Sequence, residues 1–196
     1  LEAATYNVAR KADAVTMFET GSVFLGETSE GLPHEEEHVA AVMTGKWLDH
    51  SWQGERKTVD FFVLKGIIEG LFAKIGLDKH MSFEQAQMDG LHPGRTATIK
   101  LADKMIGIVG QLHPTEQKKR DLKETYVMEL NLAKLLTFTL EPLLYTPVPR
   151  FPSISRDIAL VAERAKAAGE LEKIIRSAGG KLLKDVRVFD LYEGEK

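Results

Sequence analysis

Residues 58–75 decide the fold, and they read Thr-Val-Asp-Phe-Phe-Val-Leu-Lys-Gly-Ile-Ile-Glu-Gly-Leu-Phe-Ala-Lys-Ile. Apolar residues recur at intervals of three and four, the spacing of one helix face, at Phe61, Leu64, Ile68, Leu71 and Ile75. Phe62, Ile67 and Phe72 widen this stripe, so we expect a helix that is buried on more than one side. Thr58 is the predicted N-cap, and Gly76 is the predicted residue just beyond the helix end.

The segments on either side of this helix favour a mixture of short helices and strands. Before it, we expect helix over 1–11, strand over 14–24, a polar loop over 27–37 and a buried strand over 38–43 that ends at Gly45. After it, we expect a hairpin of strands 96–101 and 105–111, a helical segment over 114–123, a strand over 126–132 and a helical turn over 132–136.

A proline-rich segment, Leu140–Pro152, follows these elements. Proline restricts the preceding residue and lacks a backbone donor, so this segment is interpreted as a domain boundary. Beyond it, 156–161 and 182–192 are predicted as strands, and 167–178 as an amphipathic helix that Gly179-Gly180 ends. The second part of the chain is therefore expected to be one β-α-β unit.

Composition excludes several classes of protein. The 196 residues are 43% hydrophobic and 28% charged, as in an ordinary folded protein. No apolar stretch is long enough for a bilayer span. The absence of cysteine excludes disulfides, cysteine zinc sites and thiol nucleophiles. A cytoplasmic location is the default expectation without a signal-peptide pattern, and a start at Leu1 suggests a piece of a larger protein.

The charge is distributed unevenly along the chain. The formal net charge is −3, but residues 150–196 contain ten Lys and Arg against eight Asp and Glu. A strongly basic surface is the usual sign of general nucleic-acid binding, and the whole chain has none. Four cations, opposed only by Asp185, fall within twelve residues and are the candidate RNA contacts: Arg176, Lys181, Lys184 and Arg187. The alternative is a solvated face of mixed charge.

Three histidine motifs each have a simple structural interpretation. His34-Glu-Glu-Glu-His38 fits the H-E-x-x-H pattern of zinc proteases, which needs a helix, but Pro33 and the following strand favour an exposed acidic loop. His92-Pro-Gly-Arg95 is predicted to be a type II turn at a hairpin entry, with anion binding by Arg95 as the functional alternative. His113-Pro114 predicts a strand-to-helix turn.

The patterns of several catalytic classes are missing from the sequence. There is no Walker-type phosphate loop, no dinucleotide-binding glycine motif and no nucleophile elbow. Gly107 and Gly110 lie within a strand pattern and are expected to permit close packing. From the residues alone, we predict no catalytic, cofactor-binding or metal-binding residue in this chain.

Six motifs, in order, carry a resemblance to a known family. They are Phe18-Glu-Thr-Gly-Ser-Val-Phe24, Val59-Asp-Phe-Phe-Val-Leu-Lys-Gly66, His92-Pro-Gly-Arg-Thr-Ala97, Ile106-Gly-Ile-Val-Gly-Gln-Leu-His-Pro114, Phe151-Pro-Ser-Ile-Ser-Arg-Asp-Ile-Ala-Leu160 and Val188-Phe-Asp-Leu-Tyr-Glu-Gly194. This series resembles the C-terminal part of the bacterial phenylalanyl-tRNA synthetase β subunit, over essentially the whole chain.

The resemblance implies an α+β fold in two parts. Residues 1–145 would be a catalytic-like module, an antiparallel sheet of the class II synthetase type flanked by helices. Residues 150–196 would begin the ferredoxin-fold domain that binds the tRNA anticodon stem. The family assembles as (αβ)₂ with the α subunit, and the whole enzyme uses ATP and Mg²⁺ to attach phenylalanine to its tRNA. Activation and transfer belong to the α subunit.

The residues agree with a non-catalytic role for this part of the β subunit. Class II chemistry clamps ATP with an Arg-x-Glu after the second-motif strand, and here Leu25-Gly-Glu27 follows that strand instead. We therefore expect a structural and tRNA-binding role. The alternatives are a free-standing synthetase-like RNA-binding or regulatory protein, and a metalloenzyme built on His34 and His38.

Residues 150–196 are expected to contain only the first half of a ferredoxin-like domain. A ferredoxin-like domain runs β-α-β-β-α-β, and its third strand lies between the first two. The sequence ends at Lys196, after one β-α-β unit. We therefore expect this half to be marginally ordered, or completed by strand exchange with a second molecule, and not to bind tRNA specifically by itself.

Overall fold

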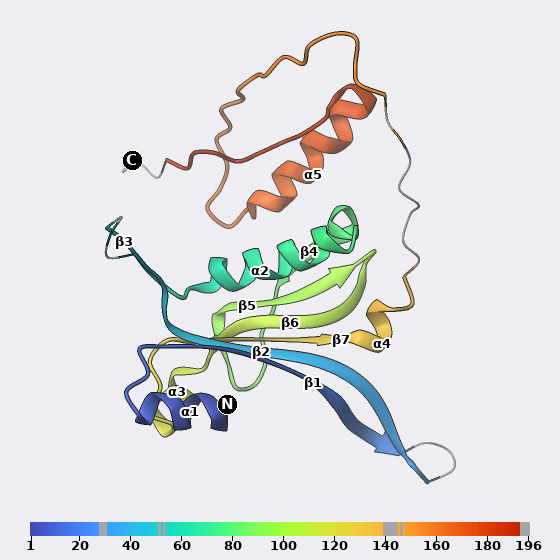
Figure 1. Ribbon diagram of the computed structural model, residues 1–196. Helices are drawn as coiled ribbons and strands as arrows, with labels where there is room; N and C mark the ends of the chain where they lie inside the picture. Colours follow the sequence, from blue (N-terminus) through green and yellow to red (C-terminus); the bar gives the residue numbers. More distant parts are fainter. Residues whose placement is uncertain (28–30, 51, 53, 139–144, 146, 193–196) are drawn as a thin grey trace. The chain divides into compact units, whose positions relative to one another are not determined.

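The computed structural model describes residues 1–27, 31–50, 52, 54–138, 145 and 147–192 (Figure 1). The chain divides into two compact units, residues 1–143 and 144–196. The proline-rich segment that was interpreted as a boundary lies partly outside the described residues, at 139–144 and 146.

The first unit is built on an antiparallel sheet. Its elements are α1 (Glu2–Ala9), β1 (Ala14–Glu27), β2 (Pro33–His50), β3 (Glu55–Thr58), α2 (Phe61–Lys74), the 3₁₀ turn η1 (Asp78–His80), β4 (Met81–Gln85), β5 (Leu91–Leu101), β6 (Lys104–Leu112), α3 (Pro114–Lys119), β7 (Thr125–Asn131) and α4 (Leu132–Leu135). In the described residues the strand order is β1-β2-β7-β6-β5-β4, with β3 paired to β2, and every pairing is antiparallel.

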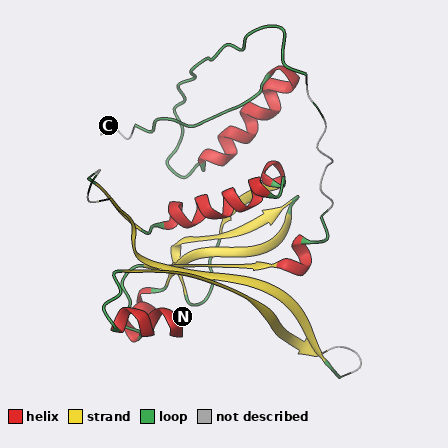
Figure 2. Cartoon of the chain, viewed as in Figure 1, coloured by secondary structure: helices red, strands yellow, loops and turns green. Residues whose placement is uncertain are grey.

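The main core lies between α2 and one face of this sheet (Figure 2). Leu64, Ile68 and Phe72 of α2 have no exposed side-chain surface. Facing them are buried residues of the central strands, such as Val109 on β6 and Leu130 on β7. Burial of these apolar side chains is the main stabilising contribution in this unit.

The helix predicted over 58–75 is confirmed, with two corrections. Asp60, and not Thr58, is the N-cap: its Oδ1 accepts a hydrogen bond from the Val63 amide at 2.7 Å, whereas Thr58 is the last residue of β3. Phe62 is 72% exposed, so the buried stripe is narrower than predicted. Gly76 follows the helix with φ of +73°, as predicted.

β2 is longer than the sequence predicted at both ends. Residues 33–37 were expected in a loop, but they pair with β1 from Ser22 to Glu27. Gly45 was expected to end the strand, but β2 continues to His50. Gly45 has φ of +83°, and a Cβ there would lie 2.0 Å from the Asp13 carbonyl oxygen, so a glycine allows the strand to continue through this contact.

The hairpin of β5 and β6 is confirmed. Its two-residue turn, Ala102-Asp103, has φ of +47° and +66°, the signs that a type I′ turn requires. The type II turn predicted at His92-Pro-Gly-Arg95 is wrong. These residues lie within β5, Gly94 is not among the glycines with positive φ, and the register of β5 on β6 shifts between Leu91 and Thr96.

The glycines of β6 permit close packing, as expected. A Cβ on Gly107 would lie 2.3 Å from the Glu129 carbonyl oxygen and 2.7 Å from Leu130 Cδ2. A Cβ on Gly110 would lie 2.7 Å from Thr96 Oγ1. No real Cβ occupies such positions, so β6 can pack this closely only with glycine at these two sites.

In the second unit, the predicted helix is present as α5 (Ala168–Gly179), followed by the 3₁₀ turn η2 (Gly180–Leu182). The predicted strands 156–161 and 182–192 are wrong, because the described residues there form no strand (Figure 2). Extended segments become strands only when neighbouring backbone accepts their hydrogen bonds, and no ladder forms among the described residues of this unit.

We expect the amides of 156–161 and 182–192 to exchange with solvent much faster than those of β7. β7 lies between β2 and β6 and is paired on both sides, whereas the two segments of the second unit have no ladder partner in the part of the chain that the structure describes. Hydrogen exchange followed by mass spectrometry on the isolated chain measures this difference. Protection of these segments equal to that of β7, independent of concentration, would show that they form a paired sheet.

Candidate functional site

The four candidate RNA contacts lie around the end of the helix in the second unit. Arg176 is in the last turn of α5, Lys181 is in η2, and Lys184 and Arg187 follow in extended chain. All four side chains are exposed. The polarity of the helix favours cations near its C-terminal end, so α5 supports this accumulation of positive charge.

One of the four cations is engaged within the unit. Arg176 Nη2 donates to Asp185 Oδ1 at 3.2 Å and to the Val186 carbonyl oxygen at 2.8 Å. These contacts hold the chain that carries Lys184 and Arg187 beside the end of α5. Among the described residues, Lys181, Lys184 and Arg187 have no hydrogen bond or ion pair, so their charges remain available to a phosphate.

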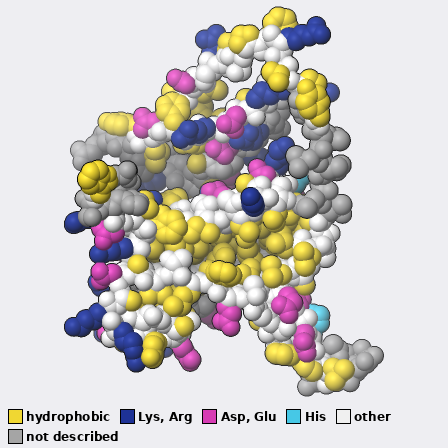
Figure 3. Space-filling view, viewed as in Figure 1, with side chains coloured by type: hydrophobic (Ala, Val, Ile, Leu, Met, Phe, Trp, Pro, Cys, Tyr) yellow, Lys and Arg dark blue, Asp and Glu magenta, His cyan; other side chains and the backbone are white. Residues whose placement is uncertain are grey.

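The charges of this unit are mixed. Figure 3 shows dark blue Lys and Arg side chains interspersed with acidic and hydrophobic side chains over the upper part of the picture, where the second unit lies. The unit therefore presents scattered cations on this face and not one continuous basic surface.

A second cluster lies on the face of the sheet opposite α2. His34, Glu36 and His38 alternate along β2, so their side chains share this face, and the predicted exposed acidic loop is wrong. Glu36 Oε1 is 3.1 Å from His34 Nε2, and Glu36 Oε2 is 3.4 Å from His38 Nε2. These contacts explain the lowered pKa of Glu36, whose largest cause is the hydrogen bond with His34.

This cluster joins two strands that are distant in sequence. His38 Nδ1 lies 2.6 Å from Glu129 Oε1 on β7, and the Asn131 side-chain amide donates to Glu36. Among the described residues, no group of three or more histidine and acidic side chains is arranged to hold a metal ion. The cluster is a hydrogen-bonded link between β2 and β7, and the H-E-x-x-H match is not a helical zinc motif here.

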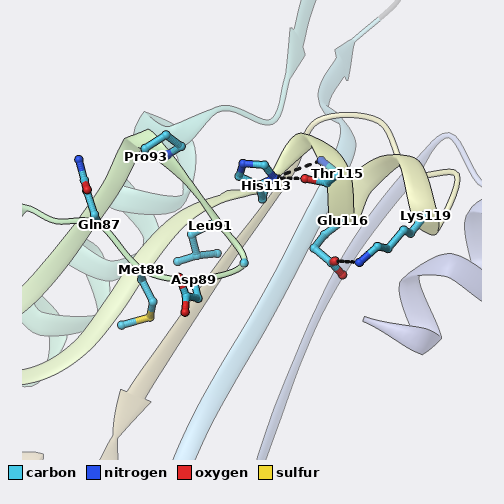
Figure 4. Close-up of a pocket in the computed structure, with 10 residues that line it drawn as sticks. Gln87, Met88, Asp89, Leu91, Pro93, His113, Thr115, Glu116 and Lys119 are labelled. Carbon is cyan, nitrogen blue, oxygen red and sulfur yellow. Dashed lines mark hydrogen bonds and ion pairs between the residues drawn. The ribbon is translucent and has the colours of Figure 1, made fainter.

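A pocket of about 680 Å³ lies where two of the sequence motifs meet. Figure 4 shows Met88 and Asp89, from the loop before β5, on one side of it, and Glu116 and Lys119 of α3 on the other. His113 caps α3, since its Nδ1 accepts from the Thr115 amide at 3.2 Å. This confirms the strand-to-helix turn predicted at His113-Pro114.

Two charged groups that line this pocket, Glu116 and Lys119, are engaged with each other, and Arg95, which does not line it, has partners of its own. Glu116 pairs with Lys119 at 2.5 Å and also with Arg120, and hydrogen bonds from these two cations lower the pKa of Glu116. Arg95, at the end of the His92 motif, donates to Gln111 Oε1 at 2.8 Å and to Glu124 Oε1 at 3.2 Å. The hydrogen bond with Glu124 raises the pKa of Arg95. Arg95 therefore secures β5 to its neighbours and has internal partners in place of an anion.

Comparison with known protein families shows which family the chain belongs to. Residues 1–132 match the family described as the phenylalanyl-tRNA synthetase beta chain CLM domain. The chain belongs to this family. Residues 149–196 match the ferredoxin-fold anticodon binding domain.

The full chain is also similar to curated phenylalanine–tRNA ligase β subunits. It is 52% identical over 196 residues to the subunit of Bacillus thuringiensis subsp. konkukian and 51% identical over 195 residues to that of Bacillus subtilis. All of the chain is covered in both cases, but only 24% of each relative. The chain thus spans about a quarter of the length of the phenylalanine–tRNA ligase β subunits it matches.

Among solved structures, pyrrolysyl-tRNA synthetase from Desulfitobacterium hafniense aligns with 67% of this chain and 44% of its own, at 14% identity and a TM-score of 0.47. None of the helices in the described part of the chain combines the length and the apolar content that crossing a bilayer requires.

Proposed function

We propose that this chain is a non-catalytic structural and tRNA-binding part of a phenylalanine–tRNA ligase, which attaches phenylalanine to its tRNA with ATP. The observation that carries the proposal is identity of about half of all residues, over the whole chain, with curated β subunits of that ligase. The match of residues 149–196 to an anticodon-binding domain supports the tRNA-binding role.

Each unit has its own part in this proposal. Residues 1–145 form a catalytic-like module of the class II synthetase type, supported by the antiparallel sheet with α2 packed on one face. Residues 150–196 begin a ferredoxin-fold anticodon-binding domain, supported by the family match in that region. Arg176, Lys181, Lys184 and Arg187 are its proposed tRNA contacts.

The chemistry of the reaction belongs to another subunit in this proposal. The hairpin of β1 and β2 contains no arginine, whereas three successive glutamates, Glu35–Glu37, lie on β2. These carboxylates would repel the phosphates of ATP, so the residues present do not fit that ligand. ATP and Mg²⁺ therefore act on the α subunit. The partners are that α subunit, in an (αβ)₂ assembly, and the phenylalanine tRNA, in the cytoplasm.

A chimeric enzyme tests the proposal. The 196 residues would replace the matching quarter of the Bacillus subtilis β subunit, and the product would be co-expressed with the Bacillus subtilis α subunit. We expect the two subunits to co-purify and the chimera to aminoacylate tRNA at a rate within tenfold of the parent enzyme. A chimera that folds and associates with the α subunit, but has neither tRNA affinity nor activity, would overturn the proposal.

The tRNA contacts can be tested in the same chimera. Replacing Lys181, Lys184 and Arg187 by glutamine is expected to weaken tRNA binding. It should also make the slope of log K against log [salt] shallower by roughly 0.7–0.9 for each phosphate contact that is lost. Binding would be measured by fluorescence anisotropy over a series of salt concentrations.

The matched control carries the same loss of three charges in the first unit. Lys74, Lys79 and Lys118 are exposed and have no partner among the described residues, and their replacement by glutamine should leave tRNA affinity unchanged. Equal losses for the two triple variants would show that only overall charge matters and would remove these residues as contacts.

A further inference from the structure

β1 forms an open edge of the sheet. In the described residues it pairs only with β2, so the backbone groups on its other side have no strand partner along fourteen residues. Natural edge strands are usually protected by lysine, proline, a bulge or a short length. β1 contains no Lys, Arg or Pro, its only charged residue before Glu27 is Glu19, and its register on β2 is regular until Leu25.

The same strand exposes large apolar side chains. Phe18 is 79% exposed, Phe24 is 63% exposed and Leu25 is 48% exposed. Figure 1 shows the β1–β2 hairpin extending well beyond the other strands of the sheet. Phe24 and Leu25 pair with Glu35 and His34 on this projecting arm, whereas Phe18 pairs with Ala41, which is itself paired with β7. An unprotected edge that also carries exposed aromatic side chains is the usual form of a strand-pairing surface.

The residues of β1 are complementary to themselves about Gly21. If a second β1 is laid antiparallel with Gly21 opposite Gly21, Phe18 faces Phe24 and Thr20 faces Ser22 on one side of the ribbon. On the other side, Met17 faces Leu25 and Glu19 faces Val23. The aromatic and hydroxyl side chains are thus matched with their own kind, as are Met17 and Leu25, whereas Glu19 faces Val23; no two like charges are opposed.

We propose that β1 pairs antiparallel with β1 of a second copy of this chain, about a two-fold axis at Gly21. This joins the two sheets into one continuous sheet. The interface is isologous, because each aromatic pair and each hydroxyl pair occurs twice across the axis. It goes beyond the ligase role proposed above and does not depend on it.

Local geometry and charge are compatible with this pairing. A Cβ on Gly21 would have nothing within 4 Å, so a side chain can be placed at the axis without a clash within the chain. The nearest dense charge is Glu35–Glu37 on β2. In the joined sheet, the two β2 strands are three strand spacings apart, about 14 Å, and repulsion over that distance is largely screened at physiological salt.

A cysteine placed on the axis gives a direct test, because the chain has no cysteine of its own. In Gly21→Cys, the two cysteines are directly opposite, and mild oxidation should cross-link most of the protein as a dimer. In the matched variant Glu19→Cys, the two cysteines are four residues apart along the paired strands, about 13 Å, and should not be cross-linked. Gly70→Cys, exposed on α2, measures random collision. Cross-linking of Gly21→Cys no faster than of these two controls overturns the proposal.

Sedimentation equilibrium provides a second measurement that needs no covalent bond. The unmodified chain should show a concentration-dependent dimer, and Phe18→Lys with Phe24→Lys should weaken it at least tenfold. Phe62→Lys, which changes a similarly exposed phenylalanine on α2, should leave it unchanged. Circular dichroism checks that each variant is folded. A chain that stays monomeric, or a dimer that the two phenylalanine changes do not affect, overturns the proposal.

Discussion

Replacing Leu64 by alanine is expected to lower the free energy of unfolding of the first unit by about 2–5 kcal/mol. The side chain has no exposed surface and lies in the core between α2 and the sheet. Its removal costs the transfer free energy of the lost methyl and methine groups and leaves a cavity that the rigid sheet cannot fill. Denaturant unfolding followed by circular dichroism measures the change.

The matched control is the same substitution, leucine to alanine, at a partly exposed position of the same helix. Leu71 is 39% exposed, so Leu71→Ala should cost well under half as much as Leu64→Ala. The two substitutions change helix propensity equally, and the comparison therefore isolates burial. If the free energy of unfolding falls by less than about 0.5 kcal/mol in both variants, the packing of α2 on the sheet does not stabilise the core as described.

Gly107→Ala is expected to lower the free energy of unfolding by about 3 kcal/mol, although it adds a single methyl group. The new Cβ would lie 2.3 Å from the Glu129 carbonyl oxygen, and that oxygen belongs to the central strand β7 and cannot move alone. Relief requires displacement of a whole strand. Thermal and denaturant unfolding of the variant measure the loss.

Gly70→Ala is the control for this prediction, and the opposite sign is expected. Gly70 lies within α2, and a Cβ there would meet nothing within 4 Å. Alanine favours helix over glycine by about 1 kcal/mol, so this variant should be more stable than the parent chain. Destabilisation of both variants by the same amount would contradict the steric argument at Gly107.

The long helix was predictable because its signal is local. The spacing of Leu64, Ile68 and Ile75 fixes the period of α2 without knowledge of any other segment. Its N-cap was misplaced because Thr58 and Asp60 are both good cap residues, and the choice depends on where β3 ends. The exposure of Phe62 depends on what covers that side, which periodicity does not report.

Errors in the strands have a different origin. Residues 33–37 belong to a polar stretch that contains glycine and proline, so local chemistry favours a loop, yet pairing with β1 makes them strand. His92-Pro-Gly-Arg95 has the residues of a turn, but the hydrogen bonds of Arg95 to Gln111 and Glu124 keep it extended in β5. In the second unit the reverse holds: 156–161 has the composition of a strand but no neighbour among the described residues.

The candidate site was predictable only in part. The four cations could be identified from their spacing in the sequence, but the engagement of Arg176 with Val186 could not, because a backbone acceptor has no sequence signature. The contact of His38 with Glu129 was missed, since the two residues are 91 positions apart. The signal that could have revealed it was the alternation of His34, Glu36 and His38, which has the period of a strand.

The position of β7 between β2 and β6 has a consequence for the order in which the chain can fold. The β1–β2 and β5–β6 hairpins join neighbouring segments and can form as soon as each has been synthesised. Their union into one sheet must wait for residues 125–131, because β7 is the strand among the described residues that pairs with both. During synthesis both hairpins therefore expose an edge that β7 later covers, and closure over so long a stretch of chain is slow. On the ribosome, this late step leaves a period in which the open edges of a nascent chain can pair with neighbouring chains.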